Sequence, residues 1–497
     1  MSIVLAIDAG TTGVRAFALD EAGKPAGYRY QEFTQHFPRP GWVEHDPTEI
    51  WTAVCAVTNQ LIGALDQPVA AIGITDQRET VVAWDRRTSR PLHRAIVWQD
   101  RRTAARCAAL EEAGHLDLVR STTGLVLDPY FSASKLEWLF TEGGVEPGPD
   151  VAVGTIDTWL LWRLTGGAVH ATEPSNASRT MLLDIRTLAW SEELCDLFGV
   201  PASALPEVRP SSGRFGTTVA EGGIPAGIPV SGMAGDQQAA LFGQACFAPG
   251  ATKNTYGTGS FVLMNVGGTC PEPVEGLLTT VAWSIPDAGS PTGTRTDYAL
   301  EGAIFSTGSA IQWLRDGLGV IAEAAEVGPL AATVDSTDGV YLVPAFSGLG
   351  SPWWDPYARA TIVGMTRGTN RAHLARAVVE AMAYQTRDVV DAMAAASGRS
   401  VQILRADGGA SVMDLLLQLQ ADQLQVPVAR PMVQETTALG AAYLAGLAEG
   451  VWSSLAEVEA HWHLDVEVAP SVAPDHADRL HRDWLRAVDR SRAWAEA

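Results

Sequence analysis

One acidic residue, Asp236, stands where a short helix is predicted to begin. It follows Gly235 and precedes residues 237–244, which have the composition of a helix. A helix N-terminus offers unpaired N–H groups and a positive dipole, so a carboxylate there can take up a proton close to an anion. Taken alone, an aspartate in this position is more often an N-cap. Two interpretations of Asp236 therefore stand at this point, a general base and a cap.

Two turns rich in glycine and threonine could hold phosphate groups. The first, residues 9–13, lies between the predicted strands 3–7 and 14–19, and the second, residues 257–259, likewise lies between two predicted strands. Backbone N–H groups in such turns can approach a phosphate closely. A P-loop or a Rossmann fingerprint would open a helix, and neither pattern occurs. The repeat suggests duplicated domains that close on a nucleotide, and two unrelated hairpin turns are the alternative.

A polar cluster, residues 75–80, follows the predicted strand 71–74. Within it, Arg78 and Glu79 together offer donors and acceptors to adjacent hydroxyl groups. Ligands of α/β folds bind at the carboxyl ends of strands, which is where this cluster is expected. A surface ion pair is the alternative for either residue alone. Trp98 and Tyr130 lie further along the chain, and an isolated aromatic residue more often belongs to the core.

The second half of the chain continues with a predicted strand at Glu301 and a turn at residues 307–309. An amphipathic helix follows, with Ile311, Leu314 and Leu318 expected to face inward.

Further elements are predicted beyond this helix. Residues 371–395 predict a long helix, and a strand at 403–407 meets Gly408 and Gly409 before a helix at 414–424. This strand, turn and helix could receive the adenosine part of a nucleotide. Residues 464–476 are rich in proline, valine and aspartate and predict a linker before a terminal helix.

The composition indicates a globular protein with two large domains. The chain has 497 residues, which is too long for one core, and 46% of them are hydrophobic. The formal charge of −22 argues against nucleic acid or an anionic membrane surface as a partner. Five widely spaced cysteines without a CxxC pair predict reduced thiols and a cytoplasmic location. Neither a signal peptide nor membrane insertion is expected.

Several stretches, in the same order along the chain, resemble the glycerol kinase branch of the FGGY carbohydrate kinase family. They lie at residues 8–12, 74–80, 96–99, 124–132, 235–244, 253–259 and 407–410, with two family signatures at 130–142 and 360–380. The resemblance implies an α/β fold of two ribonuclease-H-like, actin-type ATPase domains with the active site in the cleft between them. The expected domains are residues 1–247, with the polyol site and the first phosphate loop, and residues 248–497, with the nucleotide site.

The same resemblance implies ATP-dependent phosphorylation of glycerol to sn-glycerol 3-phosphate, with ATP and Mg²⁺ as cofactors. The glycerol-binding residues would be Arg78, Glu79, Trp98, Tyr130, Asp236, Gln237 and Phe261, of which Asp236 and Arg78 would be catalytic. The nucleotide-binding residues would be Thr11, Thr12, Gly13, Arg15, Thr258, Gly308, Gln312, Gly409 and Met413. Asp8 and Asp236 would hold Mg²⁺ through water. In this scheme Asp236 is the general base, and Arg78, which stays charged, fixes the hydroxyl groups.

Some residues depart from the family pattern. Ala9 and Gly13 replace the usual glutamine and serine of the first loop, and Met413 stands where an asparagine is usual near adenine. Two alternatives remain: an FGGY kinase for another small polyol or sugar, and an actin- or chaperone-like ATPase without a small acceptor. A homo-oligomer, a dimer or a tetramer, is also expected.

Overall fold

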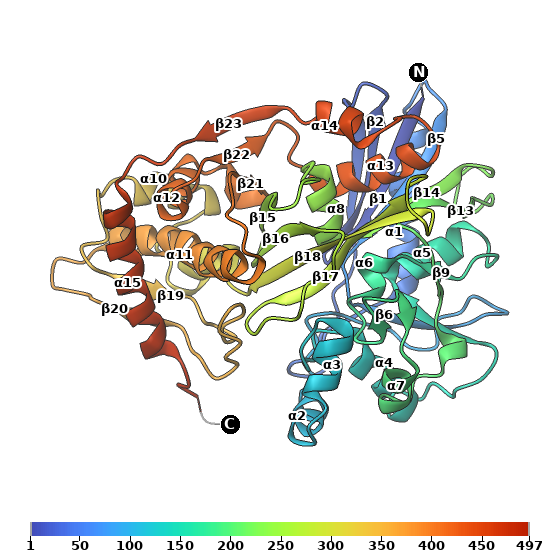
Figure 1. Ribbon diagram of the computed structural model, residues 1–497, viewed down its shortest axis with the longest axis horizontal. Coiled ribbons are helices and arrows are strands. Elements are labelled where there is room, and N and C mark those ends of the chain that lie inside the picture. The colour runs from blue at the N-terminus through green and yellow to red at the C-terminus, as the bar shows by residue number, and fades with distance from the viewer. Residues whose placement is uncertain (1, 496–497) are drawn as a thin grey trace.

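Two β-sheets lie beside each other at the centre of the computed structural model, which describes residues 2–495 (Figure 1). The first sheet has the strand order β13-β14-β5-β1-β2-β3, and the second has the order β17-β18-β16-β15-β21-β22-β23. The strands of the first sheet are β1 (Ile3–Ala9), β2 (Gly13–Asp20), β3 (Pro25–Glu32), β5 (Val69–Asp76), β13 (Ser212–Thr217) and β14 (Pro229–Gly235). Those of the second are β15 (Thr252–Tyr256), β16 (Ser260–Gly267), β17 (Leu278–Pro286), β18 (Thr294–Ile304), β21 (Leu404–Asp407), β22 (Val428–Pro431) and β23 (Leu464–Val468).

Three parallel strands of the first sheet end at the same edge. β5 pairs in parallel with both β1 and β14, and the register places Asp76 opposite Ala9 on one side and Gly235 on the other. The residues that follow these strand ends must therefore lie near one another. This register brings Asp8, the cluster after Asp76, and Asp236 to one edge of the sheet, although they are far apart in the sequence.

The second sheet repeats this arrangement. β15 pairs antiparallel with β16, as β1 does with β2, so both predicted phosphate turns are confirmed as hairpin turns between strands. β15 also pairs in parallel with β21, with Thr255 opposite Asp407. Gly408 and Gly409 therefore emerge beside the turn at residues 257–259.

Helices cover both faces of the first sheet, because its central strands are apolar on both sides. In β1, Leu5 and Ile7 face a cluster that includes α1 (Pro47–Ile62) and α5 (Ile156–Leu164), whereas Val4 and Ala6 face the other side. That other side is covered by α13 (Thr436–Ala448), which comes from the second half of the chain. The last part of the chain thus returns to the first sheet and links the two halves.

Glycines allow α13 to approach its neighbours closely. A Cβ added to Gly73 of β5 would lie 2.1 Å from the carbonyl oxygen of Ala441. On the other side of the helix, a Cβ added to Gly440 would lie 1.8 Å from the carbonyl oxygen of Ala239 in α8 (Asp236–Gly243). Both contacts are with backbone, so a side chain cannot be accommodated by rotation.

We expect Gly440→Ala to lower the free energy of unfolding by about 1–3 kcal/mol or more, because the added methyl group must push α13 away from α8. Urea denaturation of the full chain measures this change. Gly148→Ala is the control, since a Cβ at Gly148 meets nothing within 4 Å. Equal unfolding midpoints for the two variants would contradict the close packing.

Three helices cover the second sheet and its flank. They are α11 (Arg371–Ser397), α12 (Asp414–Leu424) and α15 (Pro474–Ser491) (Figure 1). α11 begins with a capping box at Asn370 and His373 and ends at Gly398, whose φ of 65° breaks the helix. The long helix predicted at 371–395 is therefore confirmed.

The remaining elements are short and mostly lie around the two sheets. The strands are β4 (Glu44–His45), β6 (Val81–Asp85), β7 (Ala95–Ile96), β8 (Val151–Thr155), β9 (Ala171–Thr172), β10 (Leu183–Asp184), β11 (Ala189–Trp190), β12 (Glu207–Val208), β19 (Tyr341–Val343) and β20 (Thr361–Val363). The helices are α2 (Ala104–Glu112), α3 (Leu116–Thr123), α4 (Ser132–Thr141), α6 (Pro174–Ala177), α7 (Glu192–Leu197), α9 (Gly308–Gln312), α10 (Val327–Ala331) and α14 (Leu455–Ala460). Within residues 2–495, none of the helices is both long and apolar enough to cross a membrane.

Two predictions of secondary structure are wrong. Residues 464–476 are not a simple linker, because β23 occupies Leu464–Val468 and pairs with β22. It is an edge strand of five residues with little burial, in which apolar and acidic residues alternate over too short a length to stand out in the sequence. Leu318 does not face inward: α9 ends at Gln312, a π-helical turn follows, and Leu318 is 46% exposed. The glycines at 317 and 319 break the helical periodicity there.

Candidate active site

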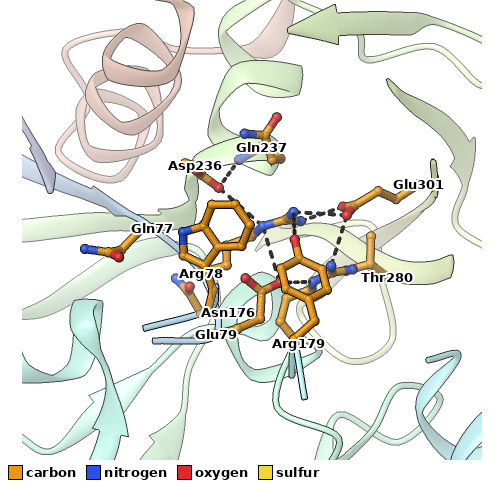
Figure 2. A network of polar contacts seen from close by, with 12 residues as sticks. Gln77, Arg78, Glu79, Asn176, Arg179, Asp236, Gln237, Thr280 and Glu301 are labelled. Carbon is orange, nitrogen blue, oxygen red and sulfur yellow. Dashed lines mark hydrogen bonds and ion pairs between the residues drawn. The ribbon is translucent and has the colours of Figure 1, made fainter. Parts of the chain in front are cut away.

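Arg78 lies two residues beyond the end of β5 and is almost completely buried. Its two Nη atoms contact the carboxylate of Glu301, at 2.5 Å and 3.0 Å. Nη2 also lies 3.2 Å from the hydroxyl of Tyr130, and Nε lies 3.3 Å from Oδ1 of Asp236. Figure 2 shows Arg78 at the centre of these contacts. Arg78 therefore meets residues from both halves of the chain.

Asp236 is the first residue of α8, and Gly235 occupies the N-cap position. Oδ1 accepts a hydrogen bond of 2.8 Å from the backbone N–H of Gln237, and the side chain is 29% exposed. Burial raises the pKa of Asp236, while Arg78 and Lys253 oppose this shift. The carboxylate thus has one side fixed by the helix and another open to an incoming group. This geometry suits a proton acceptor better than a simple cap.

Aromatic residues from both halves meet beside this cluster. Trp98 packs edge-on against Tyr130, with ring centroids 5.7 Å apart, and against Phe261 of β16, at 6.5 Å. The Phe261 ring also faces the guanidinium of Arg78 at 5.7 Å. Trp98 donates a hydrogen bond of 3.0 Å to the hydroxyl of Thr11 in the first phosphate loop. The aromatic residues therefore lie beside the polar cluster, and Trp98 contacts the first phosphate loop.

Glu79 and Gln237 complete the predicted acceptor site. Glu79 has a φ of 60°, a conformation that non-glycine residues adopt at a cost and that often occurs at functional sites. Its carboxylate accepts a hydrogen bond of 2.6 Å from Arg179. Gln237 accepts one of 2.6 Å from the ammonium of Lys253 in β15. All seven predicted glycerol-binding residues thus belong to one connected region.

The sequence did not identify three buried charged residues of this region, Arg179, Lys253 and Glu301. Lys253 and Glu301 lie inside strands of the second sheet, where Lys253 is the single charge of β15 and Glu301 shares the buried run of β18 with Asp297. A buried charge inside a strand is unusual, and this was the available signal. Burial lowers the pKa of Lys253 to about 8, despite the carboxylates of Asp407 and Asp236.

The first phosphate loop lies at the end of β1, beside Asp8. A Cβ on Gly13 would lie 2.6 Å from the hydroxyl of Tyr30. The serine that is usual at this position in the family would therefore not fit here. Arg15 lies opposite Asp8 in the β1–β2 register, and Thr12 is exposed. Burial raises the pKa of Asp8 to about 6, with Arg15 lowering it and Asp236 raising it. The charge of Asp236 therefore adds to the effect of burial on the pKa of Asp8.

The second phosphate loop is held by the start of α9. The backbone N–H of Gly308 donates to the carbonyl of Gly257 at 3.1 Å, and that of Ser309 donates to Thr258 at 3.0 Å. A Cβ on Gly308 would lie 2.5 Å from the same Gly257 oxygen, which requires glycine there.

The predicted adenosine-binding residues lie around these loops. Gly409 has open space at its Cα and follows β21, and Gln312 is exposed at the end of α9. Met413 packs against Gly328 of α10 and the apolar cluster of the second sheet. An apolar surface therefore replaces the amide expected from the family pattern.

A cavity of about 590 Å³ lies elsewhere, between α11, α12 and α15. Arg376, Glu380, Tyr384 and Arg486 are among its lining residues, and none of the predicted site residues lines it.

The chain belongs to the FGGY family of carbohydrate kinases. The family's N-terminal domain matches residues 3–243, and its C-terminal domain matches residues 252–449. The two sheets described above form the ribonuclease-H-like, actin-type arrangement of this family, as the sequence predicted. Membership in a family of carbohydrate kinases makes the chain a kinase and removes the alternative of an actin- or chaperone-like ATPase.

The chain is similar over nearly its whole length to proteins named glycerol kinase. It is 53% identical over 502 residues to one from Dechloromonas aromatica, covering 99% of this chain and 98% of that protein. The corresponding match from Bordetella parapertussis is 52% identical, with 99% and 97% covered. A solved structure of Plasmodium falciparum glycerol kinase with ADP superimposes with a TM-score of 0.92 at 35% identity, covering 99% of this chain and 98% of that one. A xylulose kinase from Lactobacillus acidophilus, at 22% identity and a TM-score of 0.88, shares the fold.

Proposed function

We propose that this protein transfers the γ-phosphoryl group of ATP to glycerol and releases sn-glycerol 3-phosphate and ADP. The observation that carries this proposal is the small acceptor site in which Arg78, Glu79 and Asp236 lie beside Trp98 and Phe261. Polar groups on one side suit adjacent hydroxyls, and aromatic rings on the other suit a short carbon chain. The similarity to proteins named glycerol kinase supports the same assignment.

Asp236 is the general base in this proposal. Its partly exposed carboxylate accepts the proton from the primary hydroxyl as that oxygen attacks phosphorus. Arg78 and Glu79 hold the hydroxyl groups of the acceptor, so the attacking oxygen stays aligned with the phosphoryl group. Phosphoryl transfer needs little covalent help from the protein, and positioning together with charge neutralisation provides most of the rate.

The nucleotide is held by the two hairpin turns, one from each sheet. The loop of Thr11, Thr12 and Gly13 and the loop of Thr258 present backbone N–H groups to the phosphates, with Arg15 as a nearby cation. Gly308, Gln312, Gly409 and Met413 surround the sugar and the base. The P. falciparum glycerol kinase was solved with ADP, which supports ATP as the phosphoryl donor here.

Mg²⁺ would be held through water by Asp8 and Asp236. Within residues 2–495 no group of three or more His, Cys, Asp or Glu side chains could bind a metal directly. Two carboxylates at one edge of the first sheet, beside a phosphate loop, fit a hydrated Mg²⁺, which usually keeps several waters. The ion, when bound, would neutralise phosphate charge. Asp8 would orient the water molecules around Mg²⁺, and the charge of the ion would stabilise the ionised form of Asp8.

The test of the proposed function is ADP release by the purified protein with glycerol, xylulose, ribitol or gluconate as acceptor. We expect glycerol to give the highest kcat/KM, because the aromatic residues leave little room for a longer chain. A much higher kcat/KM with xylulose, ribitol or gluconate would assign the protein to another acceptor in the same family.

We expect Met413→Asn to change mainly the KM for ATP and to leave kcat nearly unchanged. Met413 lies on the nucleotide side, away from the reacting phosphate, so its contacts are equal in the ground state and the transition state. Steady-state kinetics with varied ATP at saturating glycerol measure both constants. A large fall in kcat with an unchanged KM would place Met413 close to the chemistry instead.

Three further expectations stay predictions. They are the division of the chain after residue 247, a dimer or tetramer, and a cytoplasmic location. Size-exclusion chromatography with light scattering tests the second.

A further inference from the structure

Glu301 is a carboxylate of the second half that is fully buried among arginines of the first half. It lies in β18 and accepts hydrogen bonds from both Nη atoms of Arg78, at 2.5 Å and 3.0 Å. Its Oε1 also accepts a hydrogen bond of 2.9 Å from Nη2 of Arg179. Although burial favours the neutral form, Arg179 and Arg78 lower the pKa of Glu301 to about 2, so it remains ionised. Figure 2 shows Glu301 facing both guanidinium groups.

Arg179 links Glu301 to Glu79, one of the predicted glycerol-binding residues. It follows α6 and is fully buried, and its Nε donates a hydrogen bond of 2.6 Å to Oε1 of Glu79. Its guanidinium lies 5.4 Å from the ring of Tyr130. Its Nη1 is buried and has no hydrogen-bond partner among residues 2–495. Arg179 therefore bridges Glu301 and Glu79 while its Nη1 stays unsatisfied. Because a buried unsatisfied donor is unfavourable, we infer that the bridge between the two carboxylates has a role of its own.

Glu79 is fixed at both its backbone and its carboxylate. Its φ of 60° is unusual for glutamate, and its carbonyl accepts a hydrogen bond of 3.1 Å from the hydroxyl of Ser132. The ion pair with Arg179 fixes the other end of the residue. A strained residue persists only where its surroundings determine its position.

The two arginines and the two glutamates balance in charge. Arg78 and Arg179 are both buried, as are Glu79 and Glu301, and each member contacts at least one of opposite charge. Removing one charge from such a group leaves another uncompensated, so the remaining side chains must shift. Without the charge of Glu301, both guanidinium groups would depend on Glu79 and Asp236, the two carboxylates that the acceptor needs.

We propose that Glu301 and Arg179 are positioning residues for the acceptor, with Glu301 holding Arg78 and, through Arg179, holding Glu79. This proposal rests on the proposed function, since Arg78 and Glu79 are taken as the groups that bind glycerol. Glu301 belongs to the second sheet, which carries the second phosphate loop, so the acceptor site is complete only when the two halves are in contact. The alternative is that Glu301 simply links the halves and contributes stability without affecting the acceptor.

Glu301→Gln separates these two roles, because glutamine keeps the shape of the side chain and loses its charge. We expect the KM for glycerol to rise about tenfold or more, which corresponds to about one strong charge-assisted hydrogen bond. The KM for ATP should stay close to that of the wild type, because Glu301 contacts none of the predicted nucleotide-binding residues. The melting temperature is recorded for each variant.

Glu380→Gln is the matched control. Glu380 of α11 is also a buried glutamate bound to an arginine and a tyrosine, with Arg376 Nε at 2.8 Å and Tyr384 Oη at 3.1 Å. We expect it to lower the melting temperature and to leave both KM values unchanged. If Glu301→Gln lowers the melting temperature as Glu380→Gln does and leaves the KM for glycerol unchanged, the positioning role is wrong. An equal rise in the KM for ATP and for glycerol would also overturn it.

Arg179→Lys provides a second, milder variant if Glu301→Gln does not fold. Lysine keeps the positive charge but cannot reach Glu79 and Glu301 in the same fork geometry. The expected result is again a higher KM for glycerol with little change in the KM for ATP, and an unchanged KM for glycerol would contradict the bridge. All comparisons use the acceptor that the wild-type protein prefers. A wild type that prefers another acceptor therefore disproves the glycerol assignment, whereas unchanged acceptor KM values in the variants disprove the positioning role.

Discussion

Asp236→Asn is expected to lower kcat about 10²- to 10⁴-fold, which is the usual contribution of a general base. Asparagine keeps the shape of the side chain and can still accept the hydrogen bond from the N–H of Gln237, but it cannot take up a proton. Because burial raises the pKa of Asp236, its ionised form is disfavoured in the folded protein, and a neutral replacement should not destabilise it. Kinetics with saturating ATP and glycerol, together with thermal melting, measure both effects.

The competing interpretation, a helix cap, makes a different prediction for the same variant. A lost cap costs about 1 kcal/mol of stability, and asparagine caps nearly as well as aspartate, so kcat would stay near that of the wild type. Gly235, not Asp236, occupies the N-cap position, which already weakens this interpretation. If the variant keeps more than about a tenth of the wild-type kcat, Asp236 is not the base.

The second large effect is expected for Arg78→Lys. The guanidinium of Arg78 contacts Glu301, Tyr130 and Asp236 at once, and a lysine ammonium cannot match this geometry. Loss of about two charge-assisted hydrogen bonds, each about 1.5–3 kcal/mol, would lower kcat/KM for glycerol about 10²- to 10⁴-fold. The same measurement with ATP varied should show a much smaller change in its KM.

Arg102→Lys is the control for this variant. Arg102 is also a fully buried arginine with two carboxylate partners, Asp100 and Glu44, each at 2.8 Å. It should lower the melting temperature and leave the acceptor kinetics nearly unchanged. If the two variants lost kcat/KM equally, the effect of Arg78→Lys would reflect general damage to the fold.

Local patterns in the sequence predicted much of the site because its parts lie at the ends of strands. The turn at 9–13, the cluster at 75–80 and Asp236 each follow an apolar run, and parallel pairing of β1, β5 and β14 brings those ends together. The assignment of roles to Trp98, Tyr130 and Phe261 came from the family resemblance. Composition alone would have placed these aromatic residues in the core.

Other features depend on contacts between distant segments, which no local pattern reveals. Glu301 and Arg78 are 223 positions apart in the sequence. Lys253, in β15 of the second sheet, donates a hydrogen bond to Gln237 in α8. α13 likewise packs on the first sheet although it belongs to the second half. The edge strand β23 was missed because it is short and mostly exposed, so the alternation of apolar and acidic residues over its five positions is a weak signal.

The central claim, phosphoryl transfer from ATP to glycerol, is tested most directly by identifying the product. The protein is incubated with Mg²⁺, ATP and glycerol, and the product is then oxidised by a dehydrogenase specific for sn-glycerol 3-phosphate while ADP is measured in parallel. We predict that ADP and sn-glycerol 3-phosphate form in equal amounts and that neither forms at an appreciable rate without glycerol. Release of ADP at the same rate without glycerol, or a product that the dehydrogenase does not oxidise, would contradict the account.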